Sequence, residues 1–194
     1  MTASAAGNPP IAASAFSLAD ALAASEVLSV FVDLPSSRAR VEVPAFVRLE
    51  TRWKGPLPST FGSVPNKDAF AFDGAPIYPE LLVVKLLERG GWSAAWRKNW
   101  GGVAYWRDIR EPITPPALPL TILDQVSRQA GHEVPWDIVA WRGRELRLLV
   151  SRVDGGQRLS AYLANWLDAA LRMGIPLGCF AIVEHRAERL ARRR

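Results

Sequence analysis

The sequence predicts an α/β fold, because helical and strand periodicities follow each other along one chain. Apolar residues recur at helical spacing over residues 79–89, which begin with a proline and are followed by two glycines. Residues 136–153 have the period of strands instead, and a further helical pattern and a further strand follow them. A chain of 194 residues that is 49% hydrophobic can also bury a large core, about 70% of its unfolded surface.

The amino-terminal part of the chain has weaker patterns. Residues 1–15 mix Ala, Ser, Gly and Pro without periodicity, and we expect them to be disordered. Ser17 is a candidate N-cap for a helix that continues to about Leu28. The next pattern, over residues 40–50, alternates imperfectly around Pro44, which predicts an edge strand or a bulged strand.

Turn-forming residues divide the rest of the chain into segments. Prolines and a glycine between residues 55 and 65 indicate a linker before the main domain. Four tryptophans after the 79–89 helix favour core or rim packing over a platform on which bases stack; they are Trp92, Trp96, Trp100 and Trp106. We therefore predict four parts: a disordered amino terminus (1–15), an extension with its linker (16–65), a main domain (66–184) and a basic tail (185–194).

The main domain is predicted to place its helices around a group of strands. A glycine after each helical pattern marks where the helix ends, and the Arg142-Gly143 pair predicts a tight turn between two antiparallel strands. The predicted elements are helix 79–89, helix 121–130, strand 136–141, strand 145–153, helix 159–173 and strand 178–184.

The positive charge of the chain is concentrated at its carboxyl end. The net charge is +5, and residues 185–194 hold five arginines against one glutamate, which leaves +1 for the rest of the chain. Such a tail is either a contact for the phosphates of nucleic acid or a solvated end. The candidate nucleic-acid-binding residues in it are Arg189, Arg192 and Arg193.

Several classes of protein do not fit the composition. The longest apolar stretches are far shorter than the roughly 20 residues that cross a bilayer, and the amino terminus lacks the charged and apolar regions of a secretory signal. We expect a cytoplasmic protein that makes no membrane contact. One cysteine, Cys179, excludes an internal disulfide and a cysteine-based zinc site. His132 and His185 have no triad context and are predicted to lie on the surface.

Three motifs between Ile77 and Glu184 occur together: a Trp136-Asp137 pair, a Trp141-Arg142-Gly143 turn, and a helix with the sequence WLDAAL before Gly174. With these motifs the segment resembles the catalytic core of the PD-(D/E)xK nuclease superfamily, and in particular its virus-type replication-repair nuclease branch. The resemblance implies a restriction-endonuclease-like mixed sheet flanked by helices, with a divergent amino-terminal extension. It also implies nucleic acid as the partner, with DNA favoured over RNA.

The resemblance assigns roles to individual residues. In that superfamily an Asp and a Glu on the two strands of the hairpin bind a divalent cation, usually Mg²⁺, and a Lys two residues after the Glu assists the attacking water. Carboxylates supply hard oxygen ligands, and the metal lowers the pKa of its bound water. The Asp corresponds to Asp137, and a helix Glu that assists metal binding in many relatives corresponds to Glu80. The Glu-x-Lys positions fall on Val150-Ser151-Arg152.

The predicted site has therefore degenerated. Valine cannot bind a metal, and arginine stays protonated, so Arg152 could contact a phosphate but could not act as a base. Asp154 has the strand parity of Arg152 and is a candidate for a relocated metal ligand. Asp137 and Glu80 also have structural interpretations, as a carboxylate at a strand end and as an acid in the first turn of a helix.

Three functions stay open at this point. The first is a nuclease-fold protein that binds nucleic acid or a protein partner and cleaves poorly or not at all. The second is an active Mg²⁺-dependent nuclease that uses Glu80, Asp137 and Asp154. The third is a protein-interaction module that binds no nucleic acid, which the nearly neutral body of the chain and its tryptophans would suit.

Overall fold

The computed structural model describes residues 17–58, 68–98, 103–154 and 159–188 of the 194-residue chain. The predicted disorder of residues 1–15 lies outside these residues. Trp100 and the tail residues Arg189, Arg192 and Arg193 lie outside them as well.

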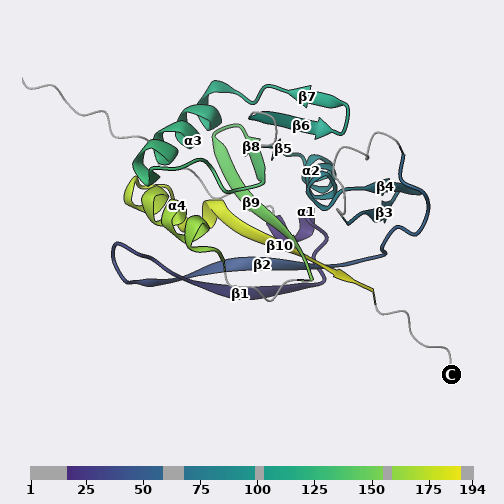
Figure 1. The fold of residues 1–194 in the computed structure, drawn as a ribbon, viewed down its shortest axis with the longest axis horizontal. Helices are drawn as coiled ribbons and strands as arrows, with labels where there is room; N and C mark the ends of the chain where they lie inside the picture. Colours follow the sequence, from purple (N-terminus) through teal and green to yellow (C-terminus); the bar gives the residue numbers. More distant parts are fainter. Residues whose placement is uncertain (1–16, 59–67, 99–102, 155–158, 189–194) are drawn as a thin grey trace, which may run out of the picture.

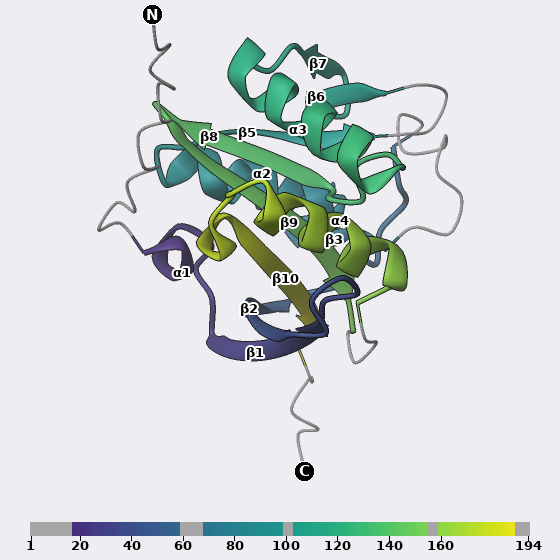
Figure 2. The same ribbon diagram turned by 90° about the vertical axis from the view of Figure 1, so that its left-hand side faces the viewer.

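An eight-stranded mixed sheet runs through the protein in the order β1-β2-β10-β9-β8-β5-β6-β7 (Figures 1 and 2). Its strands are β1 (Glu26–Asp33), β2 (Arg40–Glu50), β5 (Ser93–Lys98), β6 (Ala104–Asp108), β7 (Glu111–Ile113), β8 (Ile138–Arg142), β9 (Glu145–Val153) and β10 (Phe180–Ala187). β10 is parallel to both of its neighbours, β2 and β9, and the other neighbouring pairs are antiparallel. The predicted α/β class is confirmed.

Helices cover both faces of this sheet. They are α1 (Leu18–Ala21), α2 (Pro79–Arg89), α3 (Ala117–Ala130), α4 (Ala161–Arg172) and a short 3-10 turn, η2 (Leu177–Cys179). In Figure 1, α3 and α4 lie on one side of the sheet and α2 lies on the other. Each side has its own apolar cluster, one around Trp166 of α4 and one around Leu81 and Leu87 of α2. A small hairpin of β3 (Phe70–Phe72) and β4 (Ala75–Ile77) precedes α2.

The local signals in the sequence explain where these helices begin and end. Pro79 occupies the first turn of α2, and the predicted bounds of this helix are confirmed. The Ser160 hydroxyl caps α4 by accepting a hydrogen bond from the Leu163 N–H at 3.2 Å. α3 ends at Gly131, whose φ of 74° requires the left-handed conformation that glycine adopts readily. α3 begins four residues earlier than predicted, because the first turn of a helix tolerates prolines.

The amino-terminal extension is built into the main sheet. β2 lies between β1 and β10, so the prediction of an edge or bulged strand over residues 40–50 was wrong. Pro44 is tolerated there because the pairing of β2 with β10 begins only at Ala45, so the missing N–H of Pro44 leaves no pair of that ladder without its bond. The predicted helix to Leu28 was also too long, since α1 ends at Ala21 and the chain then enters β1.

The tryptophan-rich segment after α2 forms strands that the sequence did not predict. β5 pairs with β8 and β6 pairs with β5, which extends the sheet beyond the predicted hairpin. Trp92 and Trp96 are buried in the cluster under α2. The prediction that these side chains belong to the core is confirmed for both of them.

Candidate functional site

The β8–β9 hairpin places Asp137 beside Val150. Ile138 pairs with Leu149, so the antiparallel register brings the preceding residue, Asp137, next to Val150. The Asp137 carboxylate accepts a hydrogen bond from the Ser151 N–H, with 3.1 Å between Oδ2 and N. One carboxylate therefore lies across the hairpin from a hydrocarbon side chain, at the two positions where the resemblance implies two metal ligands.

Arg152 is held by an acid that the sequence analysis did not select. Its Nη2 lies 3.3 Å from Oε2 of Glu184, the residue that pairs with it across β9 and β10. Glu184 is buried, and its other oxygen lies 2.7 Å from Nε of Arg186. Two guanidinium groups thus share one buried carboxylate, which offsets part of the cost of taking that charge out of water.

Glu80 lies in the first turn of α2 and is buried there. Burial raises the pKa of the neighbouring Tyr78 hydroxyl, and the negative charge of Glu80 raises it further. A carboxylate in the first turn also interacts favourably with the positive end of the helix dipole. This position agrees with the structural interpretation of Glu80 as a first-turn acid.

The fold does not place the Asp154 carboxylate close to that of Asp137. It follows the last residue of β9, and its carboxylate forms an ion pair with Arg52. Asp154 is four residues beyond Val150, which is about 13 Å along a strand. One cation coordinated at about 2.3–2.6 Å cannot be shared over that separation.

The donor set of the hairpin does not fit a magnesium ion. Mg²⁺ needs oxygen ligands, and the positions next to Asp137 hold a valine and a charged guanidinium instead. In the described part of the chain, no group of three or more His, Cys, Asp or Glu side chains is placed to hold a metal ion.

Replacing Asp154 with Gly is expected to change the free energy of unfolding by less than about 1 kcal/mol. The exposed ion pair with Arg52 is worth about 0–1 kcal/mol, and glycine relieves the backbone strain at a φ of 48°. Urea unfolding followed by circular dichroism measures the change. Asp154→Ala, which removes the ion pair and keeps the strain, is the matched control, and a loss above about 2 kcal/mol in the Gly variant would contradict this assignment.

A second polar cluster crosses three strands and was not predicted. His185 of β10 is fully buried, with Nε2 3.1 Å from the Ser151 hydroxyl of β9 and Nδ1 3.5 Å from the Glu50 carboxylate of β2. Its ring stacks on Phe70 at 5.3 Å between centroids. Arg48 completes the cluster, with Nε 2.5 Å from the same Glu50 oxygen.

The prediction that His185 is a surface residue in the tail was wrong. β10 continues to Ala187, so His185 lies inside the sheet and the Phe70 ring covers it. The order Ser151, His185, Glu50 is that of a nucleophile, a base and an orienting acid. The buried imidazole has no access to a leaving group, however, so the arrangement supports a structural network rather than acyl transfer.

No family model, curated protein or solved structure matches this chain. No helix in the described ranges is long and apolar enough to cross a membrane.

The Glu50 carboxylate links the stability of this cluster to pH. Burial acts to raise its pKa, but the hydrogen bond with His185 and the positive charge of Arg48 bring the pKa below its ordinary value of 4.5. A group with a lowered folded-state pKa stabilises the protein fully above its unfolded pKa, and that contribution is lost as the pH falls.

The free energy of unfolding is therefore expected to fall as the pH decreases below about 4.5. Glu50→Gln should remove this part of the pH dependence, because the amide does not titrate. Urea unfolding of both proteins at a series of pH values measures the difference. Equal pH slopes for the two proteins below this pH would show that Glu50 is not the group responsible.

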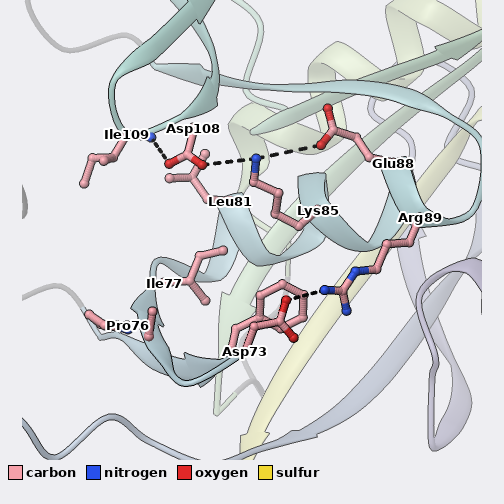
Figure 3. A pocket seen from close by; sticks show the side chains of 11 residues that line it. Asp73, Pro76, Ile77, Leu81, Lys85, Glu88, Arg89, Asp108 and Ile109 are labelled. Carbon is pink, nitrogen blue, oxygen red and sulfur yellow. Dashed lines mark hydrogen bonds and ion pairs between the residues drawn. The ribbon is translucent and has the colours of Figure 1, made fainter.

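A hollow of about 580 Å³ lies between the β3–β4 hairpin, α2 and the end of β6 with the following Ile109 (Figure 3). Its charged side chains face one another. Lys85 Nζ is 3.1 Å from the Asp108 carboxylate, and the Arg89 guanidinium pairs with Asp73 and lies 4.4 Å from the centre of the Phe72 ring. The charged groups of these four residues are therefore paired with one another. None of the predicted site residues lines the hollow.

Proposed function

We propose that this protein binds nucleic acid through a nuclease-like fold and does not cleave it by a metal-dependent reaction. The observation that carries the proposal is the hairpin at which Asp137 lies beside Val150, with Arg152 two residues further along β9. The mixed sheet with helices on both faces supports it, because this is the architecture that the resemblance implies.

The chemistry of the hairpin suits binding better than hydrolysis. Metal-dependent cleavage needs ligands that hold the ion and a group that positions the attacking water. Val150 supplies no ligand, and the Arg152 guanidinium stays protonated, so it neutralises a phosphate without accepting a proton. The ion pair with Glu184 of β10 holds the guanidinium at the edge of the hairpin that faces β10.

The experiment that tests this function combines binding and cleavage. Labelled single-stranded, duplex and branched DNA, and RNA of the same sequences, are incubated with the full chain and Mg²⁺ or Mn²⁺. We expect a shift in fluorescence anisotropy without shortened products. Metal-dependent cleavage that Asp137→Ala abolishes would show a working nuclease, and the absence of binding to every substrate would favour a protein-interaction module.

The basic tail is expected to strengthen binding by neutralising phosphates. Ending the chain after Glu188 removes Arg189 and the arginines at 192–194 while it keeps the whole of β10. A plot of log affinity against log salt concentration has a negative slope. For every phosphate that is no longer neutralised, this slope should become flatter by roughly 0.9 for duplex DNA. Anisotropy titrations at several salt concentrations measure that slope.

A variant of full length with the same four arginines replaced by Gln is the matched control. It removes the charge without changing the length of the chain, so it should reproduce the reduced slope. If binding occurs and neither variant changes the slope, the tail does not touch the phosphates.

A further inference from the structure

The two edges of the sheet differ in how well they are protected. β7 has three residues, one of which is Pro112, and a short strand with a proline is a poor template for pairing. β1 has eight residues and contains neither proline nor lysine. It stands at the end of the strand order, where β2 is its one neighbour among the described strands. Among the described strands, β1 is therefore the long edge that is open to a further strand.

The main-chain groups of alternate β1 residues point away from β2. Leu34 donates its N–H to Ala39, which fixes the even-numbered residues as those that bond inward. Ser29 lies opposite Pro44, which has no N–H to offer, and this agrees with an outward orientation for Ser29. The N–H and C=O groups of Val27, Ser29 and Phe31 thus face the open edge.

The side chains of the same residues are exposed. Two of them are apolar, and the small Ser29 side chain lies between them. Val27 is 54% exposed and Phe31 is 55% exposed. The strand is therefore symmetric about Ser29 in the character of its exposed side chains.

We propose that two copies of this chain pair through antiparallel β1 strands, with the two-fold axis at Ser29. This pairing places Val27 of each copy opposite Phe31 of the other, so that the exposed apolar side chains cover one another. It adds about six main-chain hydrogen bonds, because three outward-facing residues of each strand exchange pairs of bonds. The two sheets become one continuous sheet.

The hydrogen-bonding geometry limits the possible registers, and the apolar match selects one of them. Outward-facing residues must pair with outward-facing residues, which excludes every register that pairs odd with even positions. Moving the axis to Val30 would place Val27 opposite Asp33 and Ser29 opposite Phe31, and would break the apolar match.

The two acids at the ends of β1 do not prevent the approach of a second copy. Glu26 lies 3.6 Å from Arg186, and Asp33 lies 3.5 Å from Arg40. Each acid is paired with a cation of its own chain, which lowers the repulsion between two such edges.

Sedimentation analysis of the full chain without nucleic acid tests the pairing independently of the proposed function. We expect a dimer for the natural protein and for Ser29→Ala, and a folded monomer for Ser29→Pro. Both substitutions remove the hydrogen bond between the Ser29 hydroxyl and Glu42, but only proline removes the outward N–H. A monomeric natural protein at all concentrations, or equal dimerisation of the Ala and Pro variants, would overturn the proposal.

A second variant covers the case in which Ser29→Pro does not fold. Phe31→Lys keeps every main-chain group and places a charge on the open edge, which disfavours strand addition. It should be monomeric with an unchanged circular dichroism spectrum. A folded Phe31→Lys variant that still forms the dimer would overturn the proposal as well.

Disulfide crosslinking tests the register. Residues at the axis of a hydrogen-bonded antiparallel pair have Cα atoms about 5.5 Å apart, which a disulfide can bridge. Ser29→Cys should crosslink with itself under mild oxidation. Val27→Cys should crosslink only when mixed with Phe31→Cys, because its own copy lies about 13 Å away along the strand. The natural thiol, Cys179, is buried and does not interfere. Equal self-crosslinking of Val27→Cys and Ser29→Cys would overturn this register.

Discussion

Replacing His185 with Ala is expected to lower the free energy of unfolding by about 3–5 kcal/mol, because it combines a large buried deletion with the removal of hydrogen bonds. The imidazole is fully buried between Phe70 and the sheet, so its removal leaves a cavity in a packed region. It also takes away the partner of the Ser151 hydroxyl and of the Glu50 carboxylate, on two different strands. Urea unfolding at neutral pH measures the effect.

Ser151→Ala is the matched control for His185→Ala. It removes one hydrogen bond and a single oxygen atom, so we expect a loss of about 1 kcal/mol. A loss for His185→Ala that is no larger than the loss for Ser151→Ala would mean that the ring is not buried between the strands. His185→Gln, which keeps a polar end within the same space, should lie between the two.

Combining Val150→Glu with Arg152→Lys is expected to raise the affinity for Mn²⁺ or Mg²⁺ at least about tenfold, which is about 1.4 kcal/mol. The new carboxylate would lie beside Asp137 across the hairpin, so that two hard oxygen donors replace one. The lysine keeps a positive charge next to Glu184, the acid that holds Arg152 in the natural protein. Isothermal titration with the metal alone measures the gain.

Adding Asp137→Ala to the double variant is the control for this experiment. The gain in affinity should disappear, because a single restored carboxylate holds a divalent ion poorly. Val150 is partly buried against the cluster under α3 and α4, so the double variant should also be less stable without metal and recover stability when metal is added. A gain in affinity that survives Asp137→Ala would show that the ion binds elsewhere.

The elements that the sequence predicted well are those with a strong local signal. Pro79 and the following glycines set the bounds of α2, and the turn after Arg142 sets the β8–β9 hairpin. β5 was missed because residues 93–98 contain no β-branched side chain, and what makes them a strand is their pairing with β8. The place of β1 and β2 in the sheet depends on β10, which is far away in the sequence.

The candidate site was predictable only where residues close in sequence are brought together by a local turn. The hairpin register follows from the turn, so the placement of Asp137 beside Val150 could be derived from the sequence. The partners of Arg152 and His185 could not, because Glu184 and Glu50 are chosen by the parallel pairing of distant strands. Residues 184–187 begin with three consecutive polar residues and show no alternation, so no local signal extended β10 over His185.

We expect the parallel strand β10 to join the sheet after the two hairpins on either side of it have formed. β1 with β2 and β8 with β9 are hairpins of nearby residues, and such local pairings form early. β10 must then insert between β2 and β9, where Ala45 pairs with Ile182 and Leu149 pairs with Ala181. Until that step, both hairpins present unpaired edges that can capture other chains. Refolding at high protein concentration should therefore compete with aggregation, and dilution should increase the yield of native protein.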